Sequence, residues 1–178
     1  MTCVLSVLMF TPCSAQDKMR DVFLQMPDSL LPYLTEHNRL DFIDFIDSNM
    51  TAEVTTELEG KSEMLTLDDE SLELRVSSSM WVAMRLMPVS EPVDSCRQVV
   101  CMISTYGQDV PESKVEVYSL KWRRLGAAAH LALPSSPYEA SFASPTELVL
   151  KESKSLDVIA SEEREKWIPW LKNIEWKP

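Results

Sequence analysis

Between residues 52 and 122, apolar and polar side chains alternate, and this period of two limits the fold more than any other feature of the sequence. The stretch AEVTTELEG places its apolar or neutral residues on one side, namely Ala52, Val54, Thr56 and Leu58. Similar alternation recurs in SLELRV, MWVAMRLMPV and KVEVYSLKW. This pattern is typical of antiparallel strands with one buried face. The run QVVCMISTYG is apolar on both faces and therefore predicts a central strand.

The links between these strands are short and rich in turn-forming residues: EGKS, DDES, PVSEPVDS and GQDVPES. Strands joined by short links usually pair with each other. The sequence therefore predicts an antiparallel meander of about five strands.

The segment before the strands has a helical period. Residues 17–26 place four apolar residues on one side, and Pro27 ends this first helix: Met19, Val22, Phe23 and Met26. A second helix is expected to begin at the capping residue Thr35 and to run to about Asn49.

After the meander, residues 126–145 are rich in Ala, Ser and Pro and predict a surface crossing with a short helix around Ala127–Leu131. The stretches TELVL and SLDVIA suggest a hairpin, and SEEREKWIPWLKN predicts a short helix that Pro169 kinks or ends. We therefore expect an α+β fold: N-terminal helices packed on a curved antiparallel sheet (meander), with C-terminal strands and a short helix.

The first residues resemble a secretory signal. An apolar run from Val4 to Phe10 is followed by Ser14 and Ala15, which suit cleavage after residue 15. We expect residues 1–15 to be a signal peptide and residues 16–178 to be a single domain of an exported protein, in the periplasm or cell envelope. No Lys or Arg precedes the apolar run, so a buried first strand or helix stays open, as does a lipid anchor on Cys13.

The charge balance excludes some partners. The chain has 17 basic and 28 acidic residues and a net charge of −11. Such a charge repels phosphate backbones, and no Lys/Arg block is present, so neither nucleic acid nor anionic lipid is an expected partner. No further apolar run reaches about 18 residues, so no membrane span is expected.

Two cysteines follow the expected cleavage site, Cys96 and Cys101. Five residues apart on one strand, they would lie on opposite faces roughly 16 Å apart, too far for a disulfide. The sequence contains no C-x-x-C motif and no His near these two cysteines, so it does not indicate a zinc site. We expect two reduced thiols.

In LDFIDFID, an Asp stands at every third position. His37, Asp41 and Asp44 would share one arc of a helix at a spacing that could hold a divalent ion, with Asp47 beside them. Amphipathicity alone explains the same pattern, because a helix that buries two Phe and two Ile shows polar residues to water. We favour the amphipathic helix and keep a metal site at His37, Asp41 and Asp44 as the alternative hypothesis.

No catalytic or cofactor motif is recognisable. The three glycines are isolated, so no phosphate-binding loop or dinucleotide fingerprint can be written, and we expect no cofactor. The sequence contains no G-x-S-x-G, and the other histidine, His130, lies in the Ala-rich segment. Carboxylate-only chemistry stays open, because spacing in the sequence does not reveal it.

Two further groups of residues have two interpretations, core packing, which we favour, and binding. Trp167, Trp170 and Trp176 near the C-terminus either close the core or form an exposed patch for a ligand or partner. Methionines in the strands either fill gaps in the core or line an apolar cavity: Met80, Met84, Met87 and Met102.

The ordered motifs DVFLQMPDSLLPYL, NRLDFIDFID, AEVTTELEG, CRQVVCMISTYG and PESKVEVYSLKW resemble an uncharacterised, domain-of-unknown-function family of exported proteins from gut Bacteroidota. The resemblance runs from about residue 19 to the end. It implies an exported single-domain protein and assigns no activity or catalytic residue.

The function that we expect is that of a non-enzymatic, exported binding or interaction module with an unknown protein or small-molecule ligand. The first alternative is a hydrolase with a carboxylate or metal site on the helix near residues 37–47. The second is a carrier or chaperone for apolar ligands.

Overall fold

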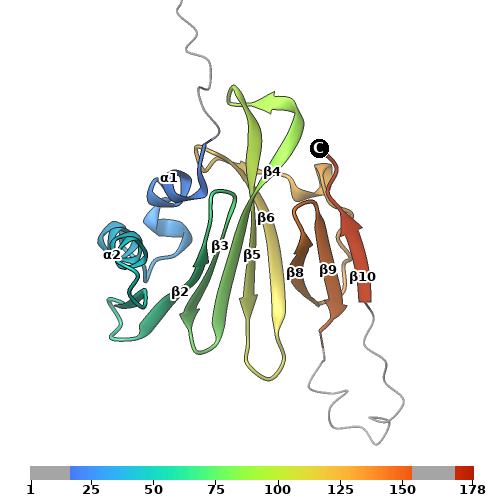
Figure 1. Ribbon diagram of the computed structural model, residues 1–178. Coiled ribbons are helices and arrows are strands. Elements are labelled where there is room, and N and C mark those ends of the chain that lie inside the picture. Colours follow the sequence, from blue (N-terminus) through green and yellow to red (C-terminus); the bar gives the residue numbers. More distant parts are fainter. Residues whose placement is uncertain (1–16, 154–170) are drawn as a thin grey trace, which may run out of the picture.

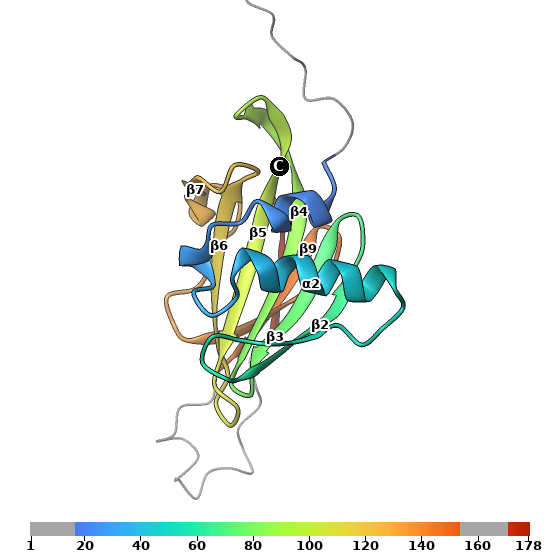
Figure 2. The same cartoon turned by 90° about the vertical axis from the view of Figure 1, so that its left-hand side faces the viewer.

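The computed structural model describes residues 17–153 and 171–178, which form three layers. Two α-helices form the first layer, a seven-stranded sheet the second and a three-stranded sheet the third (Figure 1). A view turned by 90° shows the helices in front of the large sheet and the small sheet behind it (Figure 2). The fold is α+β, as the sequence predicted.

The helical layer consists of α1 (Met19–Leu24), a 3₁₀ turn (Asp28–Leu30) and α2 (Glu36–Asp47). Thr35 caps α2 as predicted: its hydroxyl accepts from the N–H of Asn38, whose side-chain oxygen accepts from the N–H of Thr35. Phe42 and Ile43 of α2 are buried, whereas Phe45 and Ile46 are only half-buried.

The seven strands of the large sheet follow one another in sequence order, and every neighbouring pair is antiparallel. They are β1 (Glu53–Thr55), β2 (Lys61–Leu67), β3 (Ser71–Ser77), β4 (Met80–Val93), β5 (Cys96–Tyr106), β6 (Glu112–Ser119) and β7 (Arg124–Leu125). The predicted meander is confirmed, with seven strands in place of about five, because the sequence pattern had not revealed β2 or the two-residue β7.

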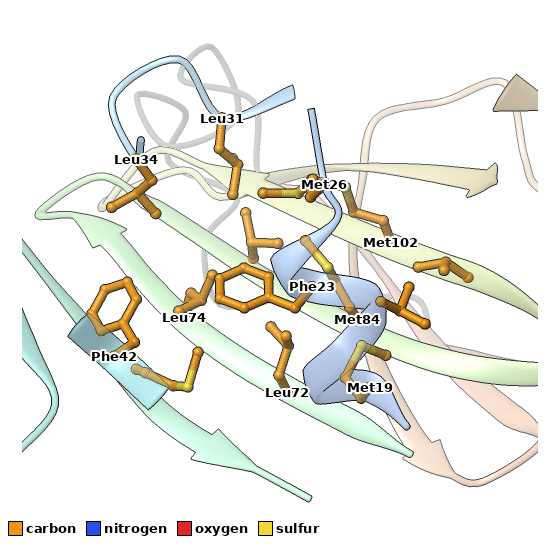
Figure 3. Close-up of a cluster of buried hydrophobic side chains, with 14 of the residues drawn as sticks. Met19, Phe23, Met26, Leu31, Leu34, Phe42, Leu72, Leu74, Met84 and Met102 are labelled. Atoms are coloured by element: carbon orange, nitrogen blue, oxygen red, sulfur yellow. The ribbon is translucent and has the colours of Figure 1, made fainter. Parts of the chain in front are cut away.

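The first core lies between the helices and the sheet (Figure 3). Helical residues such as Phe23 and Phe42 contact the side chains that β3, β4 and β5 direct to this face, including Leu72, Leu74, Met84 and Met102. Fully burying one such side chain stabilises the fold by about 1.5–3 kcal/mol. This core therefore fixes the helices on one face of the sheet.

The second core lies on the opposite face, under a small sheet made of β8 (Tyr138–Ser144), β9 (Glu147–Glu152) and β10 (Leu171–Glu175) in the order β10-β9-β8. A 3₁₀ turn at Ala127–Ala129 precedes it, close to the predicted short helix. Alternate residues of the small sheet pack on β5 and β6: Tyr138, Ala140, Leu148, Leu150 and Ile174.

The C-terminal prediction was partly wrong. The strand partner of residues 147–152 is β8, which lies within the segment expected to cross the surface, and the stretch SLDVIA lies outside the described residues. Most of the expected C-terminal helix also lies outside them, while residues 171–175 form a strand instead. Small Ala and Ser side chains weaken the alternation of β8, which explains why the pattern was missed.

Cys96 and Cys101 lie on opposite faces of β5, as predicted. Cys96 packs against the first core and Cys101 is buried in the second. Neither forms a disulfide in the described part of the chain, and burial raises the pKa of Cys101 to about 12.

Candidate functional site

The Asp ladder of α2 is the solvent-exposed side of the helix. His37, Asp41, Asp44 and Asp47 are all exposed, and Asp47 forms an ion pair with Arg20 of α1. Within residues 17–153 and 171–178, no three His, Cys, Asp or Glu side chains converge in a way that could hold a metal ion. The same part of the chain has no helix long and apolar enough to cross a bilayer.

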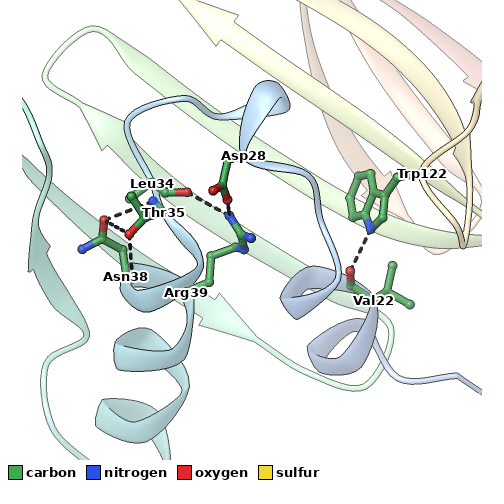
Figure 4. A network of polar contacts seen from close by, with 7 residues as sticks. All are labelled: Val22, Asp28, Leu34, Thr35, Asn38, Arg39 and Trp122. Carbon is green, nitrogen blue, oxygen red and sulfur yellow. Dashed lines mark hydrogen bonds and ion pairs between the residues drawn. The ribbon is translucent and has the colours of Figure 1, made fainter.

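Arg39 on the same helix is a buried charge that the sequence pattern did not reveal (Figure 4). Its side chain is 3% exposed, and Nη1 donates to Asp28 Oδ1 at 2.8 Å and to the carbonyl of Leu34 at 2.9 Å. Trp122 similarly donates from Nε1 to the carbonyl of Val22 at 2.9 Å. The contacts of Arg39 join two parts of the helical layer, and the contact of Trp122 joins this layer to the segment after β6. We therefore assign both residues a structural role.

Trp176 is a core residue and not part of an exposed C-terminal patch, which corrects that alternative of the sequence prediction. It is 5% exposed, its indole stacks on His130 with ring centres 4.5 Å apart, and Nε1 donates to the carbonyl of Pro88. The indole is buried because β10 carries it into the second core. Trp167 and Trp170 lie outside the described residues.

The strand methionines belong to the two cores. Met84 and Met102 are buried in the first core and Met87 in the second, while Met80 is half-buried against the first. None of them lines either of the two hollows described below.

The strongest site candidate is the part of the large sheet that the small sheet leaves open. The small sheet covers β5, β6 and part of β4, where Ala83, Met87 and Val89 pack in or against the second core. The part of this face without a layer over it, in the described part of the chain, is therefore β2, β3 and the rest of β4. We call this surface the outer face, and it carries half-buried or exposed side chains: Glu63, Glu73, Arg75, Trp81 and Arg85. Two hollows lie at its opposite ends.

The arginine hollow has a volume of about 690 Å³ and lies between the start of α1, the β2–β3 turn and the β8–β9 turn. Its lining residues are Asp17, Lys18, Asp68, Asp69, Glu70, Ser71, Arg85 and Pro145. Arg85 projects from β4, and its guanidinium carbon lies 5.2 Å from the ring centre of Phe142 on β8. An arginine from the large sheet thus meets an aromatic ring of the small sheet beside the hollow.

Two acidic residues of this hollow are held by contacts within the chain. Asp69 pairs with Lys18 at 3.1 Å, and Asp68 accepts from the hydroxyl and N–H of Ser71 and from the N–H of Glu70, each at 2.7 Å. Burial raises the pKa of Asp68, but these hydrogen bonds and the charge of Arg85 outweigh it, so the net pKa is lowered. The Asp68 carboxylate therefore stays ionised at neutral pH.

The tryptophan hollow, about 580 Å³, lies at the other end of the outer face. Trp81 is half-buried there and lies opposite Arg75 of the neighbouring strand. Arg75 lies opposite Glu63 of the next strand and forms an ion pair with it. Its other lining residues are mostly small or polar and include Ser77, Ser78 and Gln108. An aromatic side chain among hydrogen-bonding groups suits recognition of a mixed polar and apolar ligand.

Both ends of the outer face come from one strand. Trp81 and Arg85 are four residues apart on β4, so they point to the same side and their backbones lie roughly 13 Å apart at about 3.3 Å per residue. Neither Trp81 nor Arg85 is among the site residues predicted from the sequence. The available signal was the alternate set Trp81, Ala83 and Arg85 in MWVAMRLMPV, which is more polar than Val82, Met84 and Leu86.

Comparison with other proteins places the chain in a family. The profile described as "Protein of unknown function (DUF3256)" matches residues 12–158. The chain is similar to the solved structure of a domain of an uncharacterized protein from Porphyromonas gingivalis W83, with a TM-score of 0.71 and 19% identity over 89% of this chain and 95% of that one. No curated protein matches. The resemblance to a Bacteroidota family of unknown function is thereby confirmed, and the chain belongs to the DUF3256 family.

Proposed function

We propose that this protein is an exported, non-enzymatic binding protein of the periplasm or cell envelope, and that its ligand lies along the outer face. The observation that carries the proposal is the open half of the sheet, hollowed at both ends and lined by Trp81 and Arg85. Binding sites are concave and combine apolar surface with a few convergent polar groups. Export is supported by the apolar run from Val4 to Phe10 and by the small residues Ser14 and Ala15.

The lining residues favour binding over catalysis. Neither hollow is lined by a His or Cys among the described residues. Glu63 pairs with Arg75 and Glu53 with Lys61, while Asp68 and Asp69 are engaged as described above. General acid–base catalysis needs a carboxyl whose proton can move to a substrate, and carboxylates held in ion pairs serve this poorly.

Affinity capture tests this proposal. The purified protein would be immobilised and exposed to an envelope extract from its host, and bound small molecules and proteins would be identified by mass spectrometry. Trp81→Ala should lower recovery of the specific ligand, whereas Asp44→Asn on the helical side should leave it unchanged. Trp81→Phe is a milder variant that keeps an aromatic ring. Equal recovery by wild type and Trp81→Ala would place the binding site elsewhere.

Intact mass and cell fractionation test the location. A mature N-terminus at Gln16 and recovery outside the cytoplasm are expected. An uncleaved chain in the cytoplasm would overturn the export part of the proposal and leave the binding part to the capture experiment.

A further inference from the structure

Arg85 has unused hydrogen-bonding capacity. Its Nε is buried and has no hydrogen-bond partner in the described part of the chain, and no described carboxylate forms an ion pair with it. A guanidinium carries five N–H donors in a rigid, planar arrangement. The buried Nε is out of reach of a ligand, but no hydrogen bond within the described chain involves the Nη groups of Arg85 either, so an acceptor supplied by a ligand could pair with those groups.

Other described arginines differ from Arg85 in their ion pairs, although Arg39 Nε is also buried without a hydrogen-bond partner. Five of them each hold a carboxylate: Arg20, Arg39, Arg75, Arg123 and Arg124. Arg85 lines the same hollow as four acidic residues, and within the described chain it forms an ion pair with none of them. Instead, Phe142 holds the guanidinium plane at the junction of the two sheets. Arg85 is therefore positioned for a group that comes from outside the described chain.

The charge of the hollow narrows the class of that ligand. Four carboxylates and two cations line it, so a simple anion that approaches Arg85 is repelled by the acidic rim. A carboxylate binds a guanidinium through two parallel hydrogen bonds, and an ammonium group is attracted by the carboxylates. A ligand that carries both a carboxylate and an ammonium group can pair with Arg85 and with the acidic residues of the hollow.

We propose that the arginine hollow binds a small zwitterion, such as a short peptide with free ends, whose carboxylate pairs with Arg85 and whose ammonium group faces the acidic rim around Asp68. The volume of about 690 Å³ lies in the range of small-molecule sites and suits a short peptide. This inference rests on the proposed function, because it names the ligand class at one end of the outer face.

Calorimetric titration with three matched peptides tests the inference. Trialanine carries both charges, N-acetyl-trialanine lacks the ammonium group and trialanine amide lacks the carboxylate. Wild-type protein should bind trialanine and should bind each blocked peptide about tenfold more weakly or worse, because each lacks one charged hydrogen bond. Equal binding of trialanine and its amide would overturn the role of the carboxylate.

Variants assign the effect to Arg85. Arg85→Gln should lose about tenfold or more in affinity for trialanine, and Arg85→Lys should recover only part of it, since lysine lacks the bidentate fork. Arg97→Gln is the matched control: it removes the same charge from an exposed residue of β5 and should bind as wild type does. Circular dichroism and melting would verify that each variant is folded. Unchanged binding by folded Arg85→Gln would overturn the inference.

The capture experiment separates this inference from the proposed function. If wild-type protein ignores trialanine but still recovers a ligand that Trp81→Ala loses, the zwitterion is wrong and the outer face remains the binding site. If neither trialanine nor any Trp81-dependent ligand binds, both proposals fail.

Discussion

The guanidinium of Arg85 and the ring of Phe142 stack at the junction of the two sheets, with 5.2 Å between the guanidinium carbon and the ring centre. Arg85 belongs to β4 and Phe142 to β8, more than 50 residues apart in the sequence. The pair marks the border at which the small sheet ends its cover of the large one. Beyond this border the outer face is open, and the binding proposals depend on that geometry.

The two sides of α2 should respond very differently to substitution. Asp44→Asn removes an exposed charge and should change the free energy of unfolding by less than about 0.5 kcal/mol. Phe42→Ala empties a fully buried position and should cost about 3–5 kcal/mol. Urea unfolding measures both. Phe45 is the other phenylalanine that the helical pattern placed on the buried side, but it is half-buried, so Phe45→Ala should cost less.

A chelator provides the control for the metal hypothesis. With His37, Asp41 and Asp44 acting only as exposed residues, EDTA should leave the melting temperature of the wild type unchanged. Melting that depends on EDTA in the wild type but not in Asp44→Asn would revive the metal site.

The contact between Arg39 and Asp28 should appear as a coupling free energy in a double-mutant cycle of protein stability. Asp28→Asn should destabilise the fold by about 1–2 kcal/mol, because it weakens a charge-assisted hydrogen bond to a buried guanidinium. In the background Arg39→Met, which removes the buried charge, the same change should cost almost nothing. The cycle is read from urea unfolding of the four proteins, and additive effects would show that the ion pair contributes no stability.

Asp68 should make stability depend on pH. Its pKa is lower in the folded chain than its ordinary value of 3.8, so its stabilising contribution is full above that value and is lost as the pH falls through the folded-state pKa. Because Asp68 is exposed, Asp68→Asn should cost only about 0.5–1 kcal/mol at neutral pH and nearly nothing once the pH is well below the folded-state pKa. Asp41→Asn controls for the loss of one negative charge. A cost that stays constant with pH would contradict the assignment.

The cysteines should differ in reactivity. In the native protein, iodoacetamide should label the half-buried Cys96 well before Cys101, whose burial raises its pKa to about 12 and keeps it a thiol. Unfolding without reductant should expose both for labelling. Peptide mass spectrometry reads each site, and a disulfide-linked peptide of Cys96 and Cys101 would refute their separation across β5.

The helices and the meander could be predicted because their signals are local. Helical spacing relates the buried residues Met19, Phe23 and Phe42 to their helices. Thr35 has a hydroxyl that can cap a helix N-terminus. Short turns lead neighbouring strands to pair. The small sheet was harder to predict. Its strand β8 alternates Tyr138 and Ala140 with small or polar residues, and β10 pairs with β9 across a long separation in sequence.

The candidate site was missed for a related reason. Trp81 and Arg85 form a surface only because the small sheet docks on β5, β6 and part of β4 and leaves β2, β3 and the rest of β4 open. No local pattern encodes where that sheet docks. The residues that the sequence did highlight, Asp41 and Asp44, are explained by the amphipathic helix alone.

Hydrogen exchange with and without the envelope extract tests the central proposal most directly, because it locates a binding site even when the chemical identity of the ligand is unknown. Protein incubated with the extract, repurified with its ligand and then exchanged should show slower amide exchange in β2, β3 and β4, with α2 unchanged. Protection should be absent in Trp81→Ala carried through the same steps. Protection confined to α1 and α2, or spread evenly over both sheets, would contradict binding on the outer face.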